Sequence, residues 1–248
     1  HALELSNHDL QQFASVASHD LQEPLRKIQI FGNLLIGRHD DSLNSETKEY
    51  VEKIISSAAR MKTLITDVLN YSKLSATDNI FELINLTELV EDLIEDFELI
   101  IHEKKARISF EPLCNIYANK GQIRQVFQNI ISNSLKFSKR HESPQIEIRS
   151  TRHRYKAFDS PLQNEGPYCI ISIKDNGIGF DEKYLSQIFD IFERLHTRDS
   201  YEGTGIGLAI AKKIVDKHNG LVSAKSSIGQ GAEFLLLFPV NQQSQAAL

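Results

Sequence analysis

Apolar residues recur at alternating steps of three and four along two stretches of the first 75 residues. This spacing places them on one stripe of an α-helix and is typical of the seam of a coiled coil or helical bundle. The polar residues 37–45 separate the two stretches, and Ser45 can cap the second helix. We therefore predict a helical hairpin over residues 1–75. The first stripe comprises Leu3, Leu10, Phe13, Ala17, Leu21, Pro24, Ile28, Phe31 and Leu35, and the second comprises Val51, Ile54, Ala58, Met61, Ile65 and Val68.

Two helices with one apolar stripe each cannot enclose a hydrophobic core. Four helices can, and the simplest way to obtain four is to pair the hairpins of two chains. The sequence therefore predicts a homodimer whose hairpins form a four-helix bundle.

The pattern changes after residue 75, where short strand-like runs alternate with helical ones. This order predicts an α+β sandwich over residues 76–240, with helices on one face of a mixed β-sheet. The polar residues 72–79 are the expected hinge between the two domains, and residues 241–248 are expected to be a disordered tail. The expected helices span residues 87–103, 120–138 and 205–218, and the expected strands span residues 81–86, 107–110, 115–117, 145–152, 168–174, 221–226 and 232–239.

Composition narrows the class of protein. The 248 residues are 41% hydrophobic and 25% charged, which argues against wholesale disorder, and the net charge of −5 gives no reason to expect nucleic acid as a partner. No apolar run is long enough to span a membrane and no signal peptide is visible, so we expect a cytoplasmic chain without direct membrane contact. Because the chain does not begin with methionine, we expect a fragment of a longer protein, which a sensor region with or without membrane helices could precede. The two cysteines, Cys114 and Cys169, fit no metal or disulfide pattern and are expected to be reduced and structural.

One histidine of the first helix stands out as a candidate nucleophile. His19 lies two residues from the seam positions Ala17 and Leu21, so at about 100° per residue it is turned roughly 160–200° from both and faces solvent. Pro24 removes the hydrogen bond to the Asp20 carbonyl and is expected to bend the helix nearby. From this segment alone, a surface histidine on a kinked helix explains the pattern equally well. His8 and His39 are also followed by aspartate, but neither has a proline five residues later.

Four later segments suit the binding of a nucleotide. Asn129 and Asn133 lie one turn apart on one helix face, and with Lys136 they suit hydrated Mg²⁺ and phosphates. Asp175 can accept a hydrogen bond from an amino group such as that of adenine. Residues 188–196 are aromatic and then polar, and residues 203–215 form a glycine loop that opens a helix, where free N–H groups can face an anion. Close approach of the backbone near Asp175 is allowed by Gly177 and Gly179.

Each glycine segment alone could be a plain turn. A dinucleotide-binding βαβ unit is excluded because residues 194–202 are charged and cannot be the buried strand that must precede its glycines. The chain also lacks a GxxxxGK[ST] phosphate loop. Four such segments in this order after a helical hairpin make unrelated turns a poor explanation.

Residues 8–240 resemble the catalytic region of the sensor histidine kinase family, which joins a dimerisation and phosphoacceptor hairpin to an ATP-binding domain of the Bergerat type. The resemblance implies that His19 is the phosphoacceptor, that Asp20 helps to accept the imidazole proton, and that Asn133 coordinates Mg²⁺. It further implies that Asp175 reads adenine, that residues 180–204 form part of a lid, and that phosphate passes to the receiver domain of a response regulator. The implied ATP-binding residues are Asn129, Asn133, Lys136, Asp175, Gly177, Gly179, Gly203, Thr204, Gly205, Gly207 and Leu208.

The same nucleotide-binding fold also serves ATP-driven machines, and a pseudo-kinase that only binds nucleotide is a third reading. Such ATPases resemble one another in a glutamate one turn before the magnesium asparagine, where this chain has Asn129. Without that base, hydrolysis is expected to be slow, and the γ-phosphoryl group is left for His19. Relatives that also dephosphorylate their partner typically carry threonine, asparagine or glutamine four residues after the histidine. Here that residue is Glu23, which predicts a net kinase.

Overall fold

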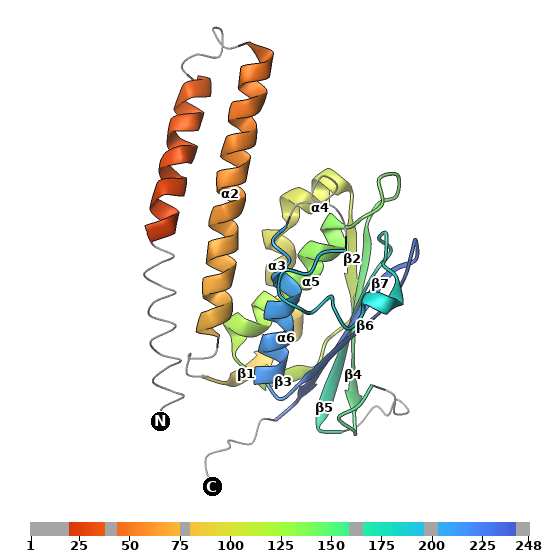
Figure 1. The fold of residues 1–248 in the computed structure, drawn as a ribbon. Helices are drawn as coiled ribbons and strands as arrows, with labels where there is room; N and C mark the ends of the chain where they lie inside the picture. Colours follow the sequence, from red (N-terminus) through yellow and green to blue (C-terminus); the bar gives the residue numbers. More distant parts are fainter. Residues whose placement is uncertain (1–19, 38–43, 75–79, 159–165, 196–202, 242–248) are drawn as a thin grey trace, which may run out of the picture. The chain divides into compact units, whose positions relative to one another are not determined.

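A computed structural model describes residues 20–37, 44–74, 80–158, 166–195 and 203–241 (Figure 1). The chain divides into two compact units, residues 1–77 and 78–248. None of the helices in these described ranges is both long and apolar enough to cross a lipid bilayer.

The first unit is a helical hairpin, as predicted. Residues 20–37 are helical and run alongside α2 (Ser45–Lys73), with a hydrogen bond from Gln22 Nε2 to Thr66 Oγ1 at 3.2 Å. Nearer the loop, a Cβ atom at Gly32 would lie only 2.6 Å from Ile55 Cγ1, so a glycine is needed where the helices approach closely. The prediction that Ser45 caps α2 is wrong by one position.

The cap of α2 is Asn44. Its side chain accepts a hydrogen bond from Thr47 N at 2.7 Å, and its own backbone is extended. Ser45 is already helical. Asparagine and serine are both good N-cap residues, and the sequence alone does not decide between neighbours of this kind.

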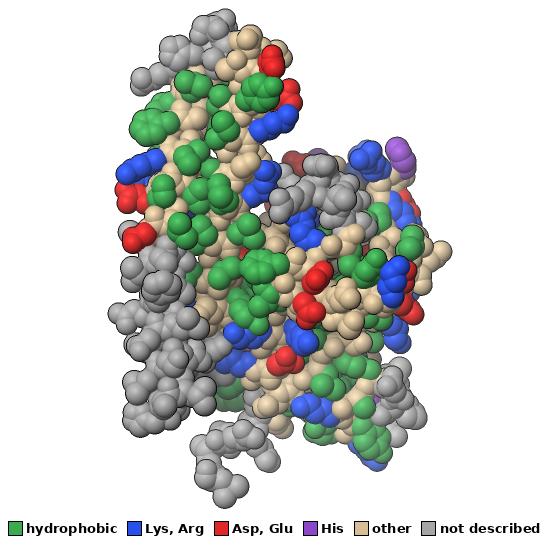
Figure 2. All heavy atoms as spheres, in the orientation of Figure 1, with side chains coloured by type: hydrophobic (Ala, Val, Ile, Leu, Met, Phe, Trp, Pro, Cys, Tyr) green, Lys and Arg blue, Asp and Glu red, His purple; other side chains and the backbone are tan. Residues whose placement is uncertain are grey.

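The hairpin leaves most of its apolar stripe uncovered within one chain. Among the described residues of this unit, the buried apolar side chains are Leu25, Ala58 and Leu74. Apolar side chains gather instead on the open face of both helices (Figure 2). The large exposed apolar residues of the two helices are Leu21, Ile28, Ile30, Phe31, Leu34, Leu35, Tyr50, Ile54, Met61 and Val68. A groove of about 480 Å³ on this face is lined by Ile28, Tyr50, Lys53, Ile54, Ser57, Ala58 and Met61.

The second unit is built on a five-stranded sheet of order β2-β4-β5-β7-β6. The β2–β4 pair is parallel and the other pairs are antiparallel, so the sheet is mixed as predicted. The strands are β2 (Arg107–Phe110), β4 (Gln145–His153), β5 (Tyr168–Asp175), β6 (Leu221–Ser227) and β7 (Gly231–Pro239). The strands β1 (Glu82–Asn85) and β3 (Asn115–Ala118) form a separate antiparallel pair, which the sequence did not indicate.

Helices α3 (Leu86–Asp96), α5 (Lys120–Lys136) and α6 (Gly207–Lys217) lie on one face of this sheet (Figure 1). Side chains alternate along a strand, and in β5 the buried Ile171, Ile173 and Asp175 share the face that the helices cover. Two of these three are apolar core residues. The third is the carboxylate that the sequence assigned to nucleotide recognition, so the packing of the core also positions Asp175.

The prediction of a single helix over residues 87–103 is wrong, because the helix is interrupted at Phe97. This residue has φ −93° and ψ 4°, and its N–H is shared between Leu93 O and Ile94 O. A second helix, α4 (Glu98–Lys104), follows at once. The α3 helix buries four apolar residues, whereas α4 buries none. No glycine or proline marks the interruption and the apolar pattern runs through it, so the sequence predicted one continuous helix. A 3₁₀ turn, η1 (Glu182–Tyr184), lies within the predicted lid segment, residues 180–204.

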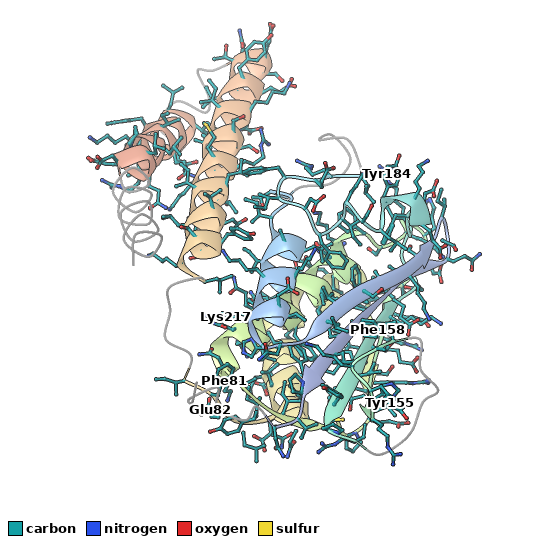
Figure 3. All side chains as sticks on the ribbon, turned by 60° about the horizontal axis from the view of Figure 1, so that its bottom comes forward. Phe81, Glu82, Tyr155, Phe158, Tyr184 and Lys217 are labelled. Carbon is teal, nitrogen blue, oxygen red and sulfur yellow. The ribbon has the colours of Figure 1, made fainter. Side chains whose placement is uncertain are left out.

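His218, immediately after α6, joins three parts of the second unit. Its Nδ1 lies 2.8 Å from Ile214 O, and its Nε2 accepts a hydrogen bond from Asn119 N at 3.1 Å. Asn119 is the N-cap residue of α5. The Phe81 ring meets the imidazole edge-on at 5.1 Å, and Figure 3 shows Phe81 and Lys217 at this end of α6. The neutral imidazole therefore links the N-terminal end of α5, the C-terminal end of α6 and Phe81 near the start of the unit.

The free energy of unfolding is expected to decrease at acid pH because of His218. Burial lowers its pKa below 6.5, and the positive charge of Lys217 adds to the effect. Below about pH 6.5 the unfolded chain binds a proton that the folded chain resists, so stability decreases by up to about 1.4 kcal/mol per pH unit until the folded-state pKa is reached. Urea unfolding followed by circular dichroism, above and below that pH, measures the slope. His218→Gln should flatten it and the exposed control His141→Gln should not; an unchanged slope in His218→Gln would contradict this assignment.

Candidate active site

The α5 helix presents three polar side chains near its C-terminal end, all half-buried: Asn129, Asn133 and Lys136. Asn129 Nδ2 donates a hydrogen bond to Gly207 O at 2.9 Å, which ties α5 to the first turn of α6. The Asn133 side chain makes no hydrogen bond to the residues that the structure describes, so its amide oxygen is available to a ligand. Lys136 lies over the Phe137 ring, with Nζ 4.2 Å from the ring centroid.

Asp175 sits at the end of β5 in a ready-made set of hydrogen-bond donors. Its Oδ1 accepts from Gly177 N at 2.8 Å and from Ala232 N at 3.1 Å, and its Oδ2 accepts from Ser134 Oγ at 3.1 Å. Burial raises the pKa of this carboxyl group, while the three hydrogen bonds act in the opposite direction. The side chain is held in one orientation, with Oδ2 less fully occupied than Oδ1.

Two of these donors, Ser134 and Ala232, were not predicted from the sequence. Ser134 is adjacent to the predicted magnesium asparagine but lies on the buried side of α5. Its hydroxyl also lies 3.1 Å from Ile130 O, so its single proton has two possible acceptors. Ala232 contributes only a backbone N–H from β7. A serine within an apolar helix face is a weak signal, and a backbone donor gives none.

The loop after β5 packs on protein backbone. A Cβ atom at Gly177 would lie 2.6 Å from Phe137 O, and Ile178 N donates to the same oxygen at 3.0 Å. Gly179 has φ +61°, and a Cβ atom there would lie 2.1 Å from Ser227 O. The close contacts of these glycines are with the end of α5 and the end of β6, and their contact with a nucleotide stays a prediction.

The glycine loop before α6 reaches the same end of α5. A Cβ atom at Gly203 would lie 2.6 Å from Lys136 Nζ. Gly205 O accepts a hydrogen bond from Phe192 N at 3.0 Å, which joins this loop to the aromatic segment. Phe192 itself has φ +69° and is 59% exposed, a strained backbone for a bulky residue. Thr204 is half-buried in the loop.

The α6 helix begins at Gly207, two residues later than predicted, and Leu208 follows in its first turn. The residue before it, Ile206, offers no side-chain cap among the described residues. The first N–H groups of a helix have no partner within the helix, so those of α6 are open to a bound anion.

Lys136 also lines a polar cavity of about 520 Å³ at the C-terminal end of α5. Its other lining residues are Glu103, Lys104, Ser138, Lys139, Arg140, Glu142 and Pro144. Lys104 Nζ donates a hydrogen bond to Leu135 O at 2.7 Å and so satisfies a carbonyl group in the last turn of α5. The four cations of this lining outnumber its two carboxylates, which makes the surroundings of Lys136 electropositive.

The structure thus brings the predicted α5, β5 and α6 residues into one unit. It does not add the predicted phosphoacceptor to them, because His19, like His8 and His39, lies outside the described residues. Asp20 is the first described residue of the hairpin and is exposed.

Two family models match the chain. Residues 9–77 match the His Kinase A (phospho-acceptor) domain, and residues 118–242 match the histidine kinase-, DNA gyrase B- and HSP90-like ATPases. The chain belongs to the sensor histidine kinases. The predicted order of a helical region followed by an α+β ATP-binding domain is confirmed, and the kinase carries both parts.

Curated relatives extend the match over almost the whole chain. Cyanobacterial phytochrome A of Nostoc sp. is 40% identical over 240 residues, which are 97% of this chain and 30% of that protein. Drug sensory protein A of Synechocystis sp. is 33% identical over 231 residues, 90% of this chain and 34% of that protein. The kinase chain therefore spans about a third of the length of these relatives.

Solved structures share the fold of the kinase. Full-length ShkA in complex with AMPPNP matches with a TM-score of 0.67 and 26% identity, over 94% of this chain and 47% of that chain. Histidine kinase ThkA, in complex with the response regulator TrrA, matches with a TM-score of 0.62 over 96% of this chain and 65% of that chain. At 21% identity, the likeness to ThkA shows the fold alone.

Proposed function

We propose that this kinase transfers the γ-phosphoryl group of ATP to His19 and then passes it to an aspartate of a response regulator. The observation that carries the proposal is the Asp175 site beside α5 and the uncapped start of α6, in a chain that also supplies a phosphoacceptor-type hairpin. The solved complex of ThkA with a response regulator supports the choice of partner. Because ATP is the phosphoryl donor, we expect this catalytic region to be located in the cytoplasm.

The adenine is assigned to Asp175. Because Oδ1 already accepts two backbone hydrogen bonds, Oδ2 is the oxygen with capacity for an exocyclic amino group. The phosphates are assigned to the first turn of α6, where Gly207 and Leu208 offer backbone N–H groups, and to the loop of Gly203, Thr204 and Gly205.

Mg²⁺ fits the residues at the phosphate end of this site. Asn133 offers a free amide oxygen, and Asn129 lies one turn before it with its nitrogen already engaged by Gly207 O. Mg²⁺ keeps several waters and takes few protein ligands, so an amide oxygen, water and phosphate oxygens suffice. When bound, the ion offsets the negative charge of the phosphates. Lys136 adds positive charge from the side of Gly203.

The transfer itself requires a neutral imidazole. A nitrogen of His19 forms a bond to the γ-phosphorus as the bond to the β,γ-bridging oxygen breaks and ADP leaves. An imidazole, whose ordinary pKa is about 6.5, is mostly neutral at physiological pH. Asp20 is proposed to accept the ring proton, and the N–H groups of α6 and Lys136 stabilise the charge on the phosphoryl oxygens.

An ATPase or a nucleotide-binding pseudo-kinase is the alternative. The ATPase reading requires a base beside the γ-phosphate. Asn129 occupies the relevant turn of α5, and its amide, hydrogen-bonded to Gly207 O, cannot take a proton from water. This contact favours the kinase. Incubation with γ-labelled ATP distinguishes the readings, because only the kinase yields an acid-labile phosphohistidine; free phosphate without labelled protein would support the ATPase.

A homodimer is expected in solution, formed through the open apolar face of the hairpin. Ile54 is 56% exposed on that face and lines the groove between the helices. Burying a lysine there would cost desolvation energy, so Ile54→Lys should weaken dimerisation by about tenfold or more. Light scattering at micromolar concentration gives the mass. Leu99→Lys, at an exposed leucine of the second unit, is the matched control; a monomeric wild type would refute the dimer.

Receiver dephosphorylation is expected to be slow, because the residue four after His19 is Glu23. Its carboxylate forms an ion pair with Lys27 at 2.9 Å and is half exposed, and a carboxylate charge at this position would repel both an aspartyl phosphate and a hydroxide-like water. Glu23→Thr should accelerate the loss of phosphate from the receiver, and Glu46→Thr on α2 is the control. Fast dephosphorylation by the wild type, unchanged in Glu23→Thr, would contradict the role of this charge.

A further inference from the structure

The side chain of Asn176, half-buried just after β5, has both its oxygen and its nitrogen in hydrogen bonds. Its Oδ1 accepts from Gln145 N at 2.8 Å, and its Nδ2 donates to Glu142 Oε1 at 2.8 Å and to Ser143 O at 3.1 Å. All three partners lie where the chain enters β4. Because Gln145 N can only donate and Ser143 O can only accept, this orientation of the amide is the one that satisfies all of them.

The side chain of Asn176 takes the place of its own main-chain carbonyl in the sheet. The antiparallel register of β4 and β5 ends with Ile146 opposite Asp175, so Gln145 is the next partner of Asn176. Asn176 N donates to Gln145 O at 3.2 Å, but Gln145 N donates to the side-chain oxygen in return. The main-chain carbonyl of Asn176 is thereby released from the ladder, and the chain can turn away from the sheet directly after Asp175.

The turn that follows helps to orient the Asp175 carboxylate. Gly177 N donates to Asp175 Oδ1 at 2.8 Å, and Ile178 N donates to Phe137 O at 3.0 Å. The turn is therefore held from one side by the end of α5 and from the other side by the amide of Asn176. A displacement on the side of Asn176 would move Gly177 N relative to the carboxylate that it orients.

Glu142, the charged partner of Asn176, is fixed by a second residue. Lys139 Nζ donates to Glu142 Oε2 at 2.9 Å, while Oε1 accepts from Asn176. The hydrogen bond from Lys139, followed by the one from Asn176, lowers the pKa of Glu142, so this side chain is an ionised acceptor at neutral pH. The hydrogen bond from Asn176 is therefore charge-assisted, and it depends on a donor at this position.

We infer that Asn176 is a positioning residue for nucleotide binding: its amide links the entrance of β4 to the turn after β5 and so holds the Asp175 carboxylate in place for adenine. The inference rests on the proposed role of Asp175 in the kinase. Asn176 acts on the nucleotide only through this carboxylate. Its loss should therefore weaken ATP binding and leave phosphoryl transfer from bound ATP unchanged.

The test replaces Asn176 with aspartate, which has nearly the same shape but lacks the N–H donor. In Asn176→Asp a second carboxylate faces Glu142 Oε1 and Ser143 O, so the turn should be displaced. We expect ATP affinity, measured by calorimetry, to decrease about three- to tenfold, the range for one hydrogen bond. The ATP concentration for half-maximal labelling of the protein should rise by the same factor, with an unchanged labelling rate at saturating ATP. A loss of folded protein would instead lower the saturating rate.

A second substitution reverses the polarity of the pair. Glu142→Gln supplies an N–H donor, so in combination with Asn176→Asp it restores a hydrogen bond between the two positions with donor and acceptor exchanged. The double variant should bind ATP within about twofold of Glu142→Gln alone. The matched control is Asn115→Asp, which makes the same chemical change at an exposed position of β3 and should bind ATP like the wild type.

Two results would overturn the inference: wild-type affinity in Asn176→Asp, or a double variant that binds ATP as weakly as Asn176→Asp. Asp175→Asn in the same series separates the inference from the proposed function. Unchanged affinity in Asp175→Asn would refute the adenine site itself, whereas a loss there, with wild-type affinity in Asn176→Asp, would refute only the role of Asn176. If Asn176→Asp fails to fold, as judged by circular dichroism, Asn176→Ala removes the same hydrogen bonds without added charge, and wild-type affinity in that variant would equally overturn the inference.

Discussion

His19→Gln is expected to abolish acid-labile labelling by γ-labelled ATP and to leave ATP affinity nearly unchanged. Glutamine keeps a polar side chain of similar reach but has no ring nitrogen that can accept a phosphoryl group. The predicted nucleotide residues all belong to the second unit, and His19 belongs to the first, so the substitution leaves the pocket intact. Labelling measured beside ATP affinity by calorimetry separates the two effects.

The matched controls for this experiment are His8→Gln and His39→Gln. Both positions are followed by aspartate, and each is the alternative acceptor that the sequence leaves open. They should label like the wild type. Full labelling of His19→Gln, with loss in either control, would transfer the acceptor role to that histidine.

Asp175→Asn is expected to weaken ATP binding about ten- to a hundredfold, which is the range for losing a hydrogen bond to a charged group. The hydrogen bonds around Asp175 explain the expected loss. Gly177 N and Ala232 N both donate to Oδ1, so an asparagine must place its oxygen there. Its NH₂ group then occupies the Oδ2 position and presents a donor to the adenine amino group. Ser134 can turn its hydroxyl proton to Ile130 O, and the fold is retained.

Calorimetry with ATP and ADP measures this loss. Both nucleotides should weaken by the same factor, because the adenine is common to them. Ser134→Ala is the matched control: it removes one of the three hydrogen bonds to Asp175 but leaves the carboxylate, so its effect should be much smaller. Unchanged affinity in Asp175→Asn would remove this carboxylate from adenine recognition.

The parts of the fold that follow from periodicity were predictable. The helical hairpin, α5, α6 and the five strands of the main sheet arise from local patterns within each element. The break at Phe97 was not, because neither glycine nor proline marks it and only the change in packing between α3 and α4 reveals it. The β1–β3 pair has four residues in each strand, and the paired residues lie 30 to 36 positions apart in sequence.

The residues of the site likewise divide into those that the sequence could predict and those that it could not. Asp175 and the α5 amides could be found because each has a side chain whose chemistry is informative in its own right. The donors Ser134 and Ala232 could not, since one is a small residue on an apolar face and the other acts through its backbone.

The two units are expected to differ in the molecularity of their folding. The second unit encloses its own core, with side chains such as Phe127, Ile148 and Leu236 fully buried, so its stability is independent of protein concentration. The hairpin buries little apolar surface within one chain, so in the proposed homodimer its stability would follow mass action between two chains. Dilution would then unfold the phosphoacceptor helix while the nucleotide site stays folded. In a cell, the copy number of the protein would set the fraction of chains able to present the acceptor, independently of how many can hold ATP.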